Sequence, residues 1–234
     1  MKPRYSSVAV VIPARNEEEL IGRCLDSVLV AAAAVALPVS ITVVADGCTD
    51  NTVEIARGYP GVHVVELEAA NVGSARRRGV EVALGAASST VWIANTDADS
   101  FVPANWLVEQ LRLAHRGIEL VIGTVRPNFA DLSPVQVRAW SATHPTGVAN
   151  GHVHGANLGV SARLYEEVGG YPELPEHEDV DLVARCAAVN AVTIATARCE
   201  VTTSGRQYGR TDGGYARFLR EDLLAAVPSE RTPS

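Results

Sequence analysis

The chain alternates between short, continuous apolar runs and longer segments in which apolar residues recur every three or four positions. The first run covers residues 8–12 and ends at Pro13, which is typical of a strand buried in a parallel sheet. From Glu17 the period becomes that of a helix, with acidic residues 17–19 in the first turn, where the helix dipole favours them. This change of period predicts a strand followed directly by a helix.

The same alternation continues through the first half of the chain. Further strands are predicted at 41–45, 62–67, 90–94 and 119–125, and further helices at 52–57, 74–86 and 103–115. We expect Asp50 to cap the helix over 52–57. Strands that alternate with helices at short spacing predict an α/β fold, with a mostly parallel, Rossmann-like sheet and helices on both faces.

The second half has weaker patterns. Residues 126–145 contain no clear strand, residues 152–161 are glycine-rich and extended, and a helix over 178–190 precedes a strand over 191–195. We find no internal repeat and no linker. The pattern therefore predicts one domain over 1–227, followed by a flexible tail over 228–234.

Composition narrows the class of protein. The 234 residues are 47% hydrophobic and 20% charged, which predicts a globular domain, and the net charge of −7 disfavours a broad nucleic-acid-binding surface. Residues 27–45 carry no charge, but Pro38 and the β-branched stretch after it favour a helix end and a strand over a transmembrane segment. The oligomeric state stays open.

Cysteines and the N-terminus indicate a cellular location. The four cysteines show neither zinc-site nor redox-pair spacing, which favours reduced, buried thiols: Cys24, Cys48, Cys186 and Cys199. Residues 1–7 are polar, so we expect no signal peptide. The sequence thus predicts a cytoplasmic protein and leaves peripheral attachment to a membrane open.

Four clusters of polar residues lie after predicted strands, either directly at the strand's end or at the start of the helix that follows it. They cover residues 13–17, 46–50, 71–76 and 97–99. In open parallel sheets the ligand crevice lies beyond the carboxyl ends of the strands, so we expect these clusters to converge there.

The triplet Asp97-Ala98-Asp99 gains its meaning from its position. A second Asp-x-Asp occurs at 179–181, so the pattern alone is weak, but the first copy follows the buried run 91–94 directly. Hard carboxylate oxygens suit Mg²⁺ or Mn²⁺ shared with substrate phosphates. Neither a P-loop nor Gly-x-Gly-x-x-Gly follows the first strand, which disfavours a P-loop NTPase and a dinucleotide-dependent dehydrogenase.

Together these motifs resemble the family 2 glycosyltransferases of the GT-A fold, over residues 8 to about 200. The matching segments, in order, are Val10–Glu18, Val44–Thr52, Asn71–Arg76, Asp97–Asp99, Gly155–Gly159 and Glu178-Asp179. The resemblance implies a nucleotide-binding half over about 8–100 and an acceptor half over about 101–220.

The resemblance also implies a role for each matching residue. The nucleotide-binding residues would be Pro13, Arg15, Glu17, Asp46, Gly73, Arg76 and Asp97. Asp46 would accept a hydrogen bond from the base, while Arg76, with Arg77 and Arg78 as alternatives, would lie against base or ribose. Asp99 would bind the metal, with Asp97 beside it. Asp179 would be the catalytic base, with Glu178 and Asp181 as alternatives.

The implied reaction is a metal-dependent, inverting sugar transfer from a UDP- or GDP-type donor to a hydroxyl of a small-molecule, glycan or lipid-linked acceptor. A divalent cation would neutralise the leaving diphosphate and a carboxylate would deprotonate the acceptor. The family's Gln-x-x-Arg-Trp element is missing, and residues 206–210 stand in that region, which favours a single-transfer, non-processive enzyme. Ala45 replaces the family's usual aspartate beside Asp46.

Several alternatives stay open at this point. His152 and His154 would contact acceptor or metal, or be ordinary surface or core histidines, and Trp140 and Tyr208 would stack on a sugar or serve packing. Arg206, Arg210 and Arg217 would close a glycine-rich loop over the diphosphate. Rival functions are a nucleotidyltransferase, whose glycine-rich phosphate loop is not visible, and a non-catalytic nucleotide-sugar-binding paralogue.

Overall fold

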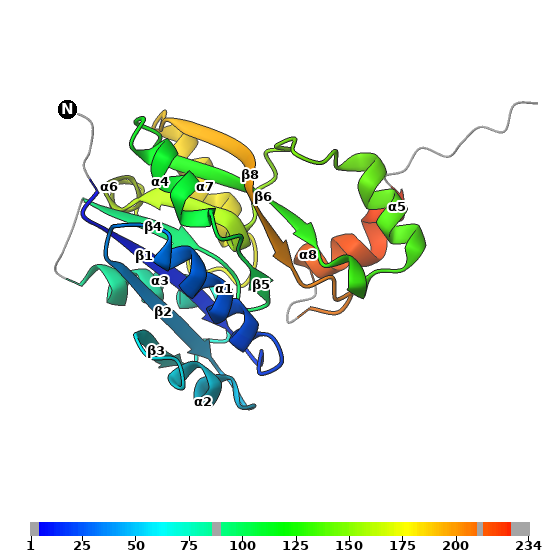
Figure 1. The fold of residues 1–234 in the computed structure, drawn as a ribbon, viewed down its shortest axis with the longest axis horizontal. Coiled ribbons are helices and arrows are strands. Elements are labelled where there is room, and N and C mark those ends of the chain that lie inside the picture. Colours follow the sequence, from blue (N-terminus) through cyan, green and yellow to red (C-terminus); the bar gives the residue numbers. More distant parts are fainter. Residues whose placement is uncertain (1–4, 86–89, 210–212, 226–234) are drawn as a thin grey trace, which may run out of the picture.

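The computed structural model describes residues 5–85, 90–209 and 213–225. The tail predicted over 228–234 and Arg210 lie outside these ranges. The described residues form one eight-stranded sheet with strand order β3-β2-β1-β4-β7-β6-β8-β5 (Figure 1).

The strands confirm the predicted sheet. They are β1 Ser7–Ala14, β2 Val39–Asp46, β3 Val62–Leu67, β4 Val91–Asn95, β5 Ser100–Phe101, β6 Leu120–Pro127, β7 Leu158–Ser161 and β8 Thr193–Thr203. Parallel pairs join β1 to β2 and β4, β2 to β3, and β6 to β8. Strand β7 is antiparallel to both β4 and β6, and β5 is antiparallel to β8. The sheet is thus mostly parallel.

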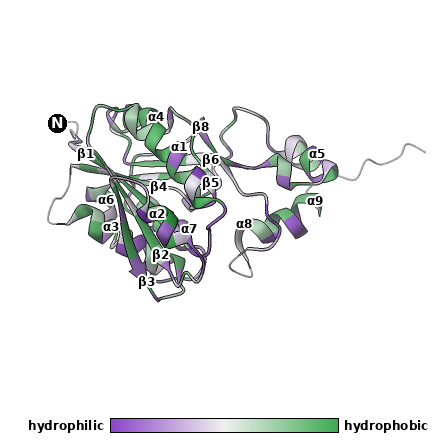
Figure 2. Cartoon of the chain, turned by 60° about the horizontal axis from the view of Figure 1, so that its bottom comes forward, coloured by the Kyte–Doolittle hydropathy of each residue, from purple (hydrophilic) through white to green (hydrophobic). Residues whose placement is uncertain are grey.

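Helices cover both faces because alternate residues of the central strands point to opposite sides. Val8, Val10 and Ile12 of β1 join the core under α1 (Ile21–Ala33), α2 (Thr52–Arg57) and α4 (Trp106–Ala114). Ala9 and Val11 join the core under α3 (Val72–Leu84), α6 (Ala162–Glu167) and α7 (Glu178–Ala188). Figure 2 shows the resulting concentration of hydrophobic residues in the middle strands.

A small lobe lies beyond the ends of β6 and β8 (Figure 1). It consists of η1 (Phe129–Asp131), α5 (Pro134–Thr143), α8 (Gly214–Arg217), η3 (Phe218–Asp222) and α9 (Leu223–Ala225). Its own core contains Ala139, Trp140, Leu219 and Leu223. We refer to these elements as the small lobe.

Several predicted boundaries are wrong for local reasons. The first helix begins at Ile21 and not at Glu17. The N–H groups of Leu20 and Ile21 bond to the Glu17 carbonyl in a separate turn, and the regular ladder begins with the bond from the Cys24 N–H to the Leu20 carbonyl. The acids at 17–19 therefore lie before the helix. Strand β8 continues to Thr203, well past the predicted end at 195, and the extended segment 152–161 ends as β7.

The uncharged segment 27–45 divides as expected into the end of α1 and strand β2. Within the described residues, no helix is long and apolar enough to cross a membrane. The four cysteines are free thiols, and three of them, Cys24, Cys186 and Cys199, are buried.

A close approach between α3 and the sheet depends on Gly79. A Cβ added there would lie 2.5 Å from Val11 Cγ1 and 3.0 Å from Val44 Cγ2. We expect Gly79→Ala to lower the free energy of unfolding by about 1–3 kcal/mol through overpacking, despite the better helix propensity of alanine. Gly22→Ala in α1 is the control, because its Cβ would lie no closer than 3.3 Å to the Tyr59 hydroxyl and 3.9 Å to Ile55 Cγ2.

Urea unfolding measures both changes. Gly22→Ala should cost clearly less than Gly79→Ala, and equal losses would contradict the close packing of α3 on the sheet.

Candidate functional site

A cavity of about 750 Å³ opens at the carboxyl ends of β1, β2 and β4. This is the position at which open parallel sheets bind ligands. Its lining includes all but one of the residues that the sequence predicted for the site, namely Pro13, Arg15, Glu17, Asp46, Arg76, Asp97, Asp99, Glu178 and Asp179. The sequence motifs therefore converge in space.

Gly73 is the exception, since it is not among the described residues that line the cavity. Its N–H donates to the Leu174 carbonyl at 3.0 Å, and an added Cβ would lie 2.1 Å from the Pro172 carbonyl oxygen. Gly73 therefore permits close contact between α3 and the loop before α7. This contact accounts for the glycine without a ligand.

Asp46 organises the loop that leads into α3. Its carboxylate accepts hydrogen bonds from the backbone N–H groups of Ala69 and Ala70, both at 2.8 Å, and of Asn71 at 2.7 Å. Asn71 in turn caps α3 by accepting from the Ser74 N–H at 2.9 Å. The carboxylate thus fixes the cavity wall formed by this loop while it faces the cavity itself.

Arg76 links the two predicted halves of the site. Its side chain is 2% exposed, and Nη2 lies 2.5 Å from Asp97 Oδ1 while Nε lies 2.8 Å from Glu178 Oε1. Gly155 leaves room for the guanidinium, because a Cβ there would lie 2.1 Å from Nη2. Arg76 was expected to lie against the base or the ribose. In the structure, its Nε and Nη2 bond to two carboxylates of the protein.

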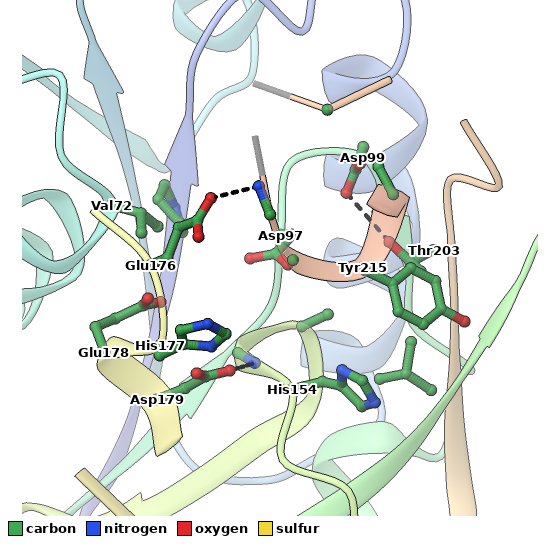
Figure 3. Close-up of a pocket in the computed structure, with 18 of the residues that line it drawn as sticks. Val72, Asp97, Asp99, His154, Glu176, His177, Glu178, Asp179, Thr203 and Tyr215 are labelled. Atoms are coloured by element: carbon green, nitrogen blue, oxygen red, sulfur yellow. Dashed lines mark hydrogen bonds between the residues drawn. The ribbon is translucent and has the colours of Figure 1, made fainter. Parts of the chain in front are cut away.

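Asp179 projects into the cavity from the first turn of α7 (Figure 3). Its Oδ2 accepts a hydrogen bond from the Gly155 N–H at 2.6 Å, and its Oδ1 accepts one from the Val180 N–H at 2.8 Å. Glu178 is buried against Arg76, and burial raises the pKa of Glu178 although Arg76 acts against this. Asp181 pairs with Arg185 on the helix surface.

Asp99 lies at the other end of the cavity, where it meets a residue from far along the chain. Its Oδ2 is 2.7 Å from Arg206 Nη2, and its Oδ1 accepts from the Thr203 hydroxyl at 3.2 Å. Arg206 also donates to both oxygens of Glu17, at 2.6 and 3.0 Å. Burial raises the pKa of Asp99, while Arg206 and Thr203 lower it. Arg206 therefore joins the ends of β1, β4 and β8.

The carboxylates at this end of the cavity are candidate ligands for a divalent cation. The described residues contain no group of three or more His, Cys, Asp or Glu side chains that could hold a metal ion. Asp97 and Asp99 do present hard oxygen ligands on the cavity wall. Mg²⁺ and Mn²⁺ bind commonly through one or two carboxylates, waters and substrate phosphates. The residues therefore fit a cation shared with a diphosphate and do not form a closed protein site.

Six ring side chains form a continuous cluster in the cavity wall: Trp140, His144, His152, His154, Tyr215 and Phe218. Trp140 and His144 stack with centroids 3.7 Å apart. Burial lowers the pKa of His154, although Asp179 acts against this, and burial likewise lowers the pKa of His144. We call this set the ring cluster. It gives the cavity a wall made largely of aromatic rings.

Three members of the ring cluster were not predicted from the sequence: His144, Tyr215 and Phe218. The first had a readable signal, because Ser133 and Gln136 form a capping box with Pro134 between them. That signature would have predicted α5, which carries Trp140 and ends just before His144, one turn further on. Tyr208 is 79% exposed and is not among the described lining residues, whereas Arg217 lines the cavity.

The buried ion pairs of Arg76 yield a stability prediction. We expect Arg76→Leu to lower the free energy of unfolding by about 3–5 kcal/mol, because it leaves Glu178 and Asp97 without their counter-ion. Arg78→Leu on the same helix is the control, since Arg78 is half-exposed and its nearest acid, Glu81, is 3.5 Å away. Chemical denaturation measures both, and a similar small loss in the two variants would contradict the role of Arg76.

Solved structures share this fold. Staphylococcus aureus TarS in complex with UDP-GlcNAc matches with a TM-score of 0.66 and 18% identity, over 89% of this chain and 61% of that chain. The mannosyltransferase PcManGT from Pyrobaculum calidifontis, in complex with GDP-Man and Mn²⁺, matches with a TM-score of 0.60 and 23% identity, over 94% and 62%. At these identities the likeness concerns the fold, which is that of GT-A glycosyltransferases.

Sequence comparison agrees with the fold. The chain is 41% identical over 63 residues to 4,4'-diaponeurosporenoate glycosyltransferase of S. aureus, an alignment that covers 27% of this chain and 16% of that protein. The chain thus matches only part of the length of these relatives. The family model described as glycosyl transferase family 2 matches residues 9–150. Since this match spans more than half of the 234 residues, the chain belongs to glycosyl transferase family 2.

Proposed function

We propose that this protein transfers a sugar from a nucleotide-diphosphate sugar to an acceptor hydroxyl, with a divalent cation, inversion at the anomeric carbon and one transfer per encounter. The observation that carries the proposal is the meeting of Asp97, Asp99 and Asp179 in one cavity. UDP-GlcNAc and GDP-Man in the two solved relatives support a donor of the UDP or GDP type.

The donor would lie along the ends of β1, β2 and β4. Pro13, Arg15 and Asp46 are proposed to line the nucleotide pocket, and Asp97 to face the ribose from the position where Arg76 holds it. Asp99, with Asp97 beside it, would hold Mg²⁺ or Mn²⁺ on the diphosphate. Bound there, the cation would neutralise the charge that develops on the leaving group.

Asp179 is proposed to act as the catalytic base. It would take the proton of the acceptor hydroxyl as that oxygen bonds to the anomeric carbon and the bond to the diphosphate breaks. Hydrogen bonds from the N–H groups of Gly155 and Val180 hold the carboxylate in place, and Glu178 steadies α7 through Arg76. A single base and direct displacement give inversion. The ring cluster would form the acceptor wall.

The first test is a thermal-shift panel of nucleoside diphosphates and triphosphates with and without Mn²⁺. We expect one diphosphate with Mn²⁺ to raise the melting temperature by about 5–10 °C at a hundredfold excess over its Kd. In Asp99→Asn this Mn²⁺-dependent shift should largely disappear. Asp181→Asn, outside the cavity, should retain it. A preference for triphosphates with release of pyrophosphate would indicate a nucleotidyltransferase instead.

The second test separates donor binding from catalysis. Asp179→Asn should keep the diphosphate-dependent shift but slow the release of nucleoside diphosphate from the donor, with water as acceptor, by about 10²–10⁴-fold. Asp181→Asn should release it at the wild-type rate. Full activity in Asp179→Asn would remove Asp179 as the base. Donor binding without any turnover in the wild type would favour a non-catalytic paralogue.

A further inference from the structure

Among the arginines that line the cavity, Arg206 pairs with two carboxylates close to the proposed metal position, Glu17 and Asp99. Its guanidinium donates to both oxygens of Glu17 and lies 2.7 Å from Asp99 Oδ2. Both carboxylates are largely buried, with 7% and 13% of their side chains exposed. One guanidinium thus neutralises two carboxylates at the point where a cation on the diphosphate is proposed to bind.

Arg76, another arginine that lines the cavity, does not share that task. Arg76 is committed to Asp97 and Glu178 and is only 2% exposed. Arg206 is 30% exposed, so its ion pairs border solvent and can open at lower cost. A divalent cation on Asp99 would lie within a few ångströms of the guanidinium if Arg206 stayed in place. Like charges at that distance in a buried site repel strongly.

We propose that Arg206 is an exchangeable counter-ion of the donor site. Without donor, its guanidinium neutralises Glu17 and Asp99. When donor and cation are bound, it leaves Asp99 and turns to the diphosphate. This inference rests on the proposed function, because it requires a nucleotide diphosphate in the cavity. Arg206 thereby acts as a positioning residue for Asp99 in one state and as a donor-binding residue in the other.

The local structure allows the exchange with little backbone movement. The Gly205 N–H donates to Asp131 Oδ2 at 2.8 Å, and the Arg206 N–H donates to the Ser204 hydroxyl at 3.2 Å. These two bonds fix the backbone that leads up to the α-carbon of Arg206. The long side chain can therefore change direction by rotation about its own bonds, within the same cavity that it already lines.

The exchange has a thermodynamic signature. A cation that binds alone displaces the guanidinium from Asp99 and leaves it with Glu17 only, so that one of its ion pairs is lost without replacement. A cation that binds with a diphosphate displaces it towards a new partner. Arg206 should therefore weaken the binding of the cation alone and strengthen the binding of cation and diphosphate together, which makes the two ligands cooperative.

Mn²⁺ binding tests this without any catalytic assay. The electron paramagnetic resonance signal of free Mn²⁺ measures its binding to the full chain, first alone and then with the nucleoside diphosphate that gives the largest thermal shift. We expect Arg206→Gln to bind Mn²⁺ alone about tenfold more tightly than the wild type. With Mn²⁺ present, the same variant should bind the diphosphate about tenfold more weakly. Arg206→Lys, which keeps the positive charge, should have affinities between those of the wild type and Arg206→Gln.

Arg57→Gln is the control for the loss of one positive charge, because Arg57 pairs with Glu66 on the exposed surface away from the cavity. It should leave both affinities unchanged. Equal or weaker binding of Mn²⁺ alone by Arg206→Gln would overturn the exchange, even where the wild type binds diphosphate and Mn²⁺ as proposed. Failure of the wild type to bind any diphosphate would instead remove the proposed function, while the Mn²⁺ titration alone still measures the effect of Arg206.

Discussion

The buried guanidinium of Arg76 is the interaction on which the site's architecture depends. It joins α3 to the loop after β4 through Asp97 and to α7 through Glu178. A buried ion pair is favourable only when every partner is present, because each charge left alone pays its full desolvation. The three segments must therefore come together as a unit. The same network sets the position of Asp179, since it follows Glu178 directly at the start of α7.

The parts of the fold that the sequence predicted well are those whose signal is local. Strand β1 lies between two parallel strands and is covered by helices on both faces, so its side chains are buried on both sides and form a continuous apolar run. Strand β8 carries no such run beyond residue 195. In its far half mostly buried and half-buried positions alternate, and this half pairs with β5 and the end of β6. Helix α5 has little amphipathic pattern, and its capping box is the one sequence signal that predicts it.

The sequence predicted many of the residues that line the candidate site, but not which of them bond to one another. Conspicuous motifs placed Asp46, Asp97 and Asp99 at the strand ends, as parallel-sheet geometry requires. Which group each carboxylate meets depends on segments distant in sequence. Asp46 meets three backbone amides of one loop, and Asp99 meets Arg206, more than a hundred residues away. No spacing rule connects such partners, because the fold alone brings them together.

The small lobe has a hydrophobic core of its own, so its residues can change independently of those that pack against the sheet. Ala139, Trp140, Leu219 and Leu223 belong to neither of the cores that cover the sheet. Substitutions in α5 or η3 can therefore reshape one wall of the cavity without disturbing the packing that holds the carboxylates at the strand ends. Under the proposed function, such a division would let a lineage change the molecule that receives the sugar while the residues proposed to bind the nucleotide stay the same.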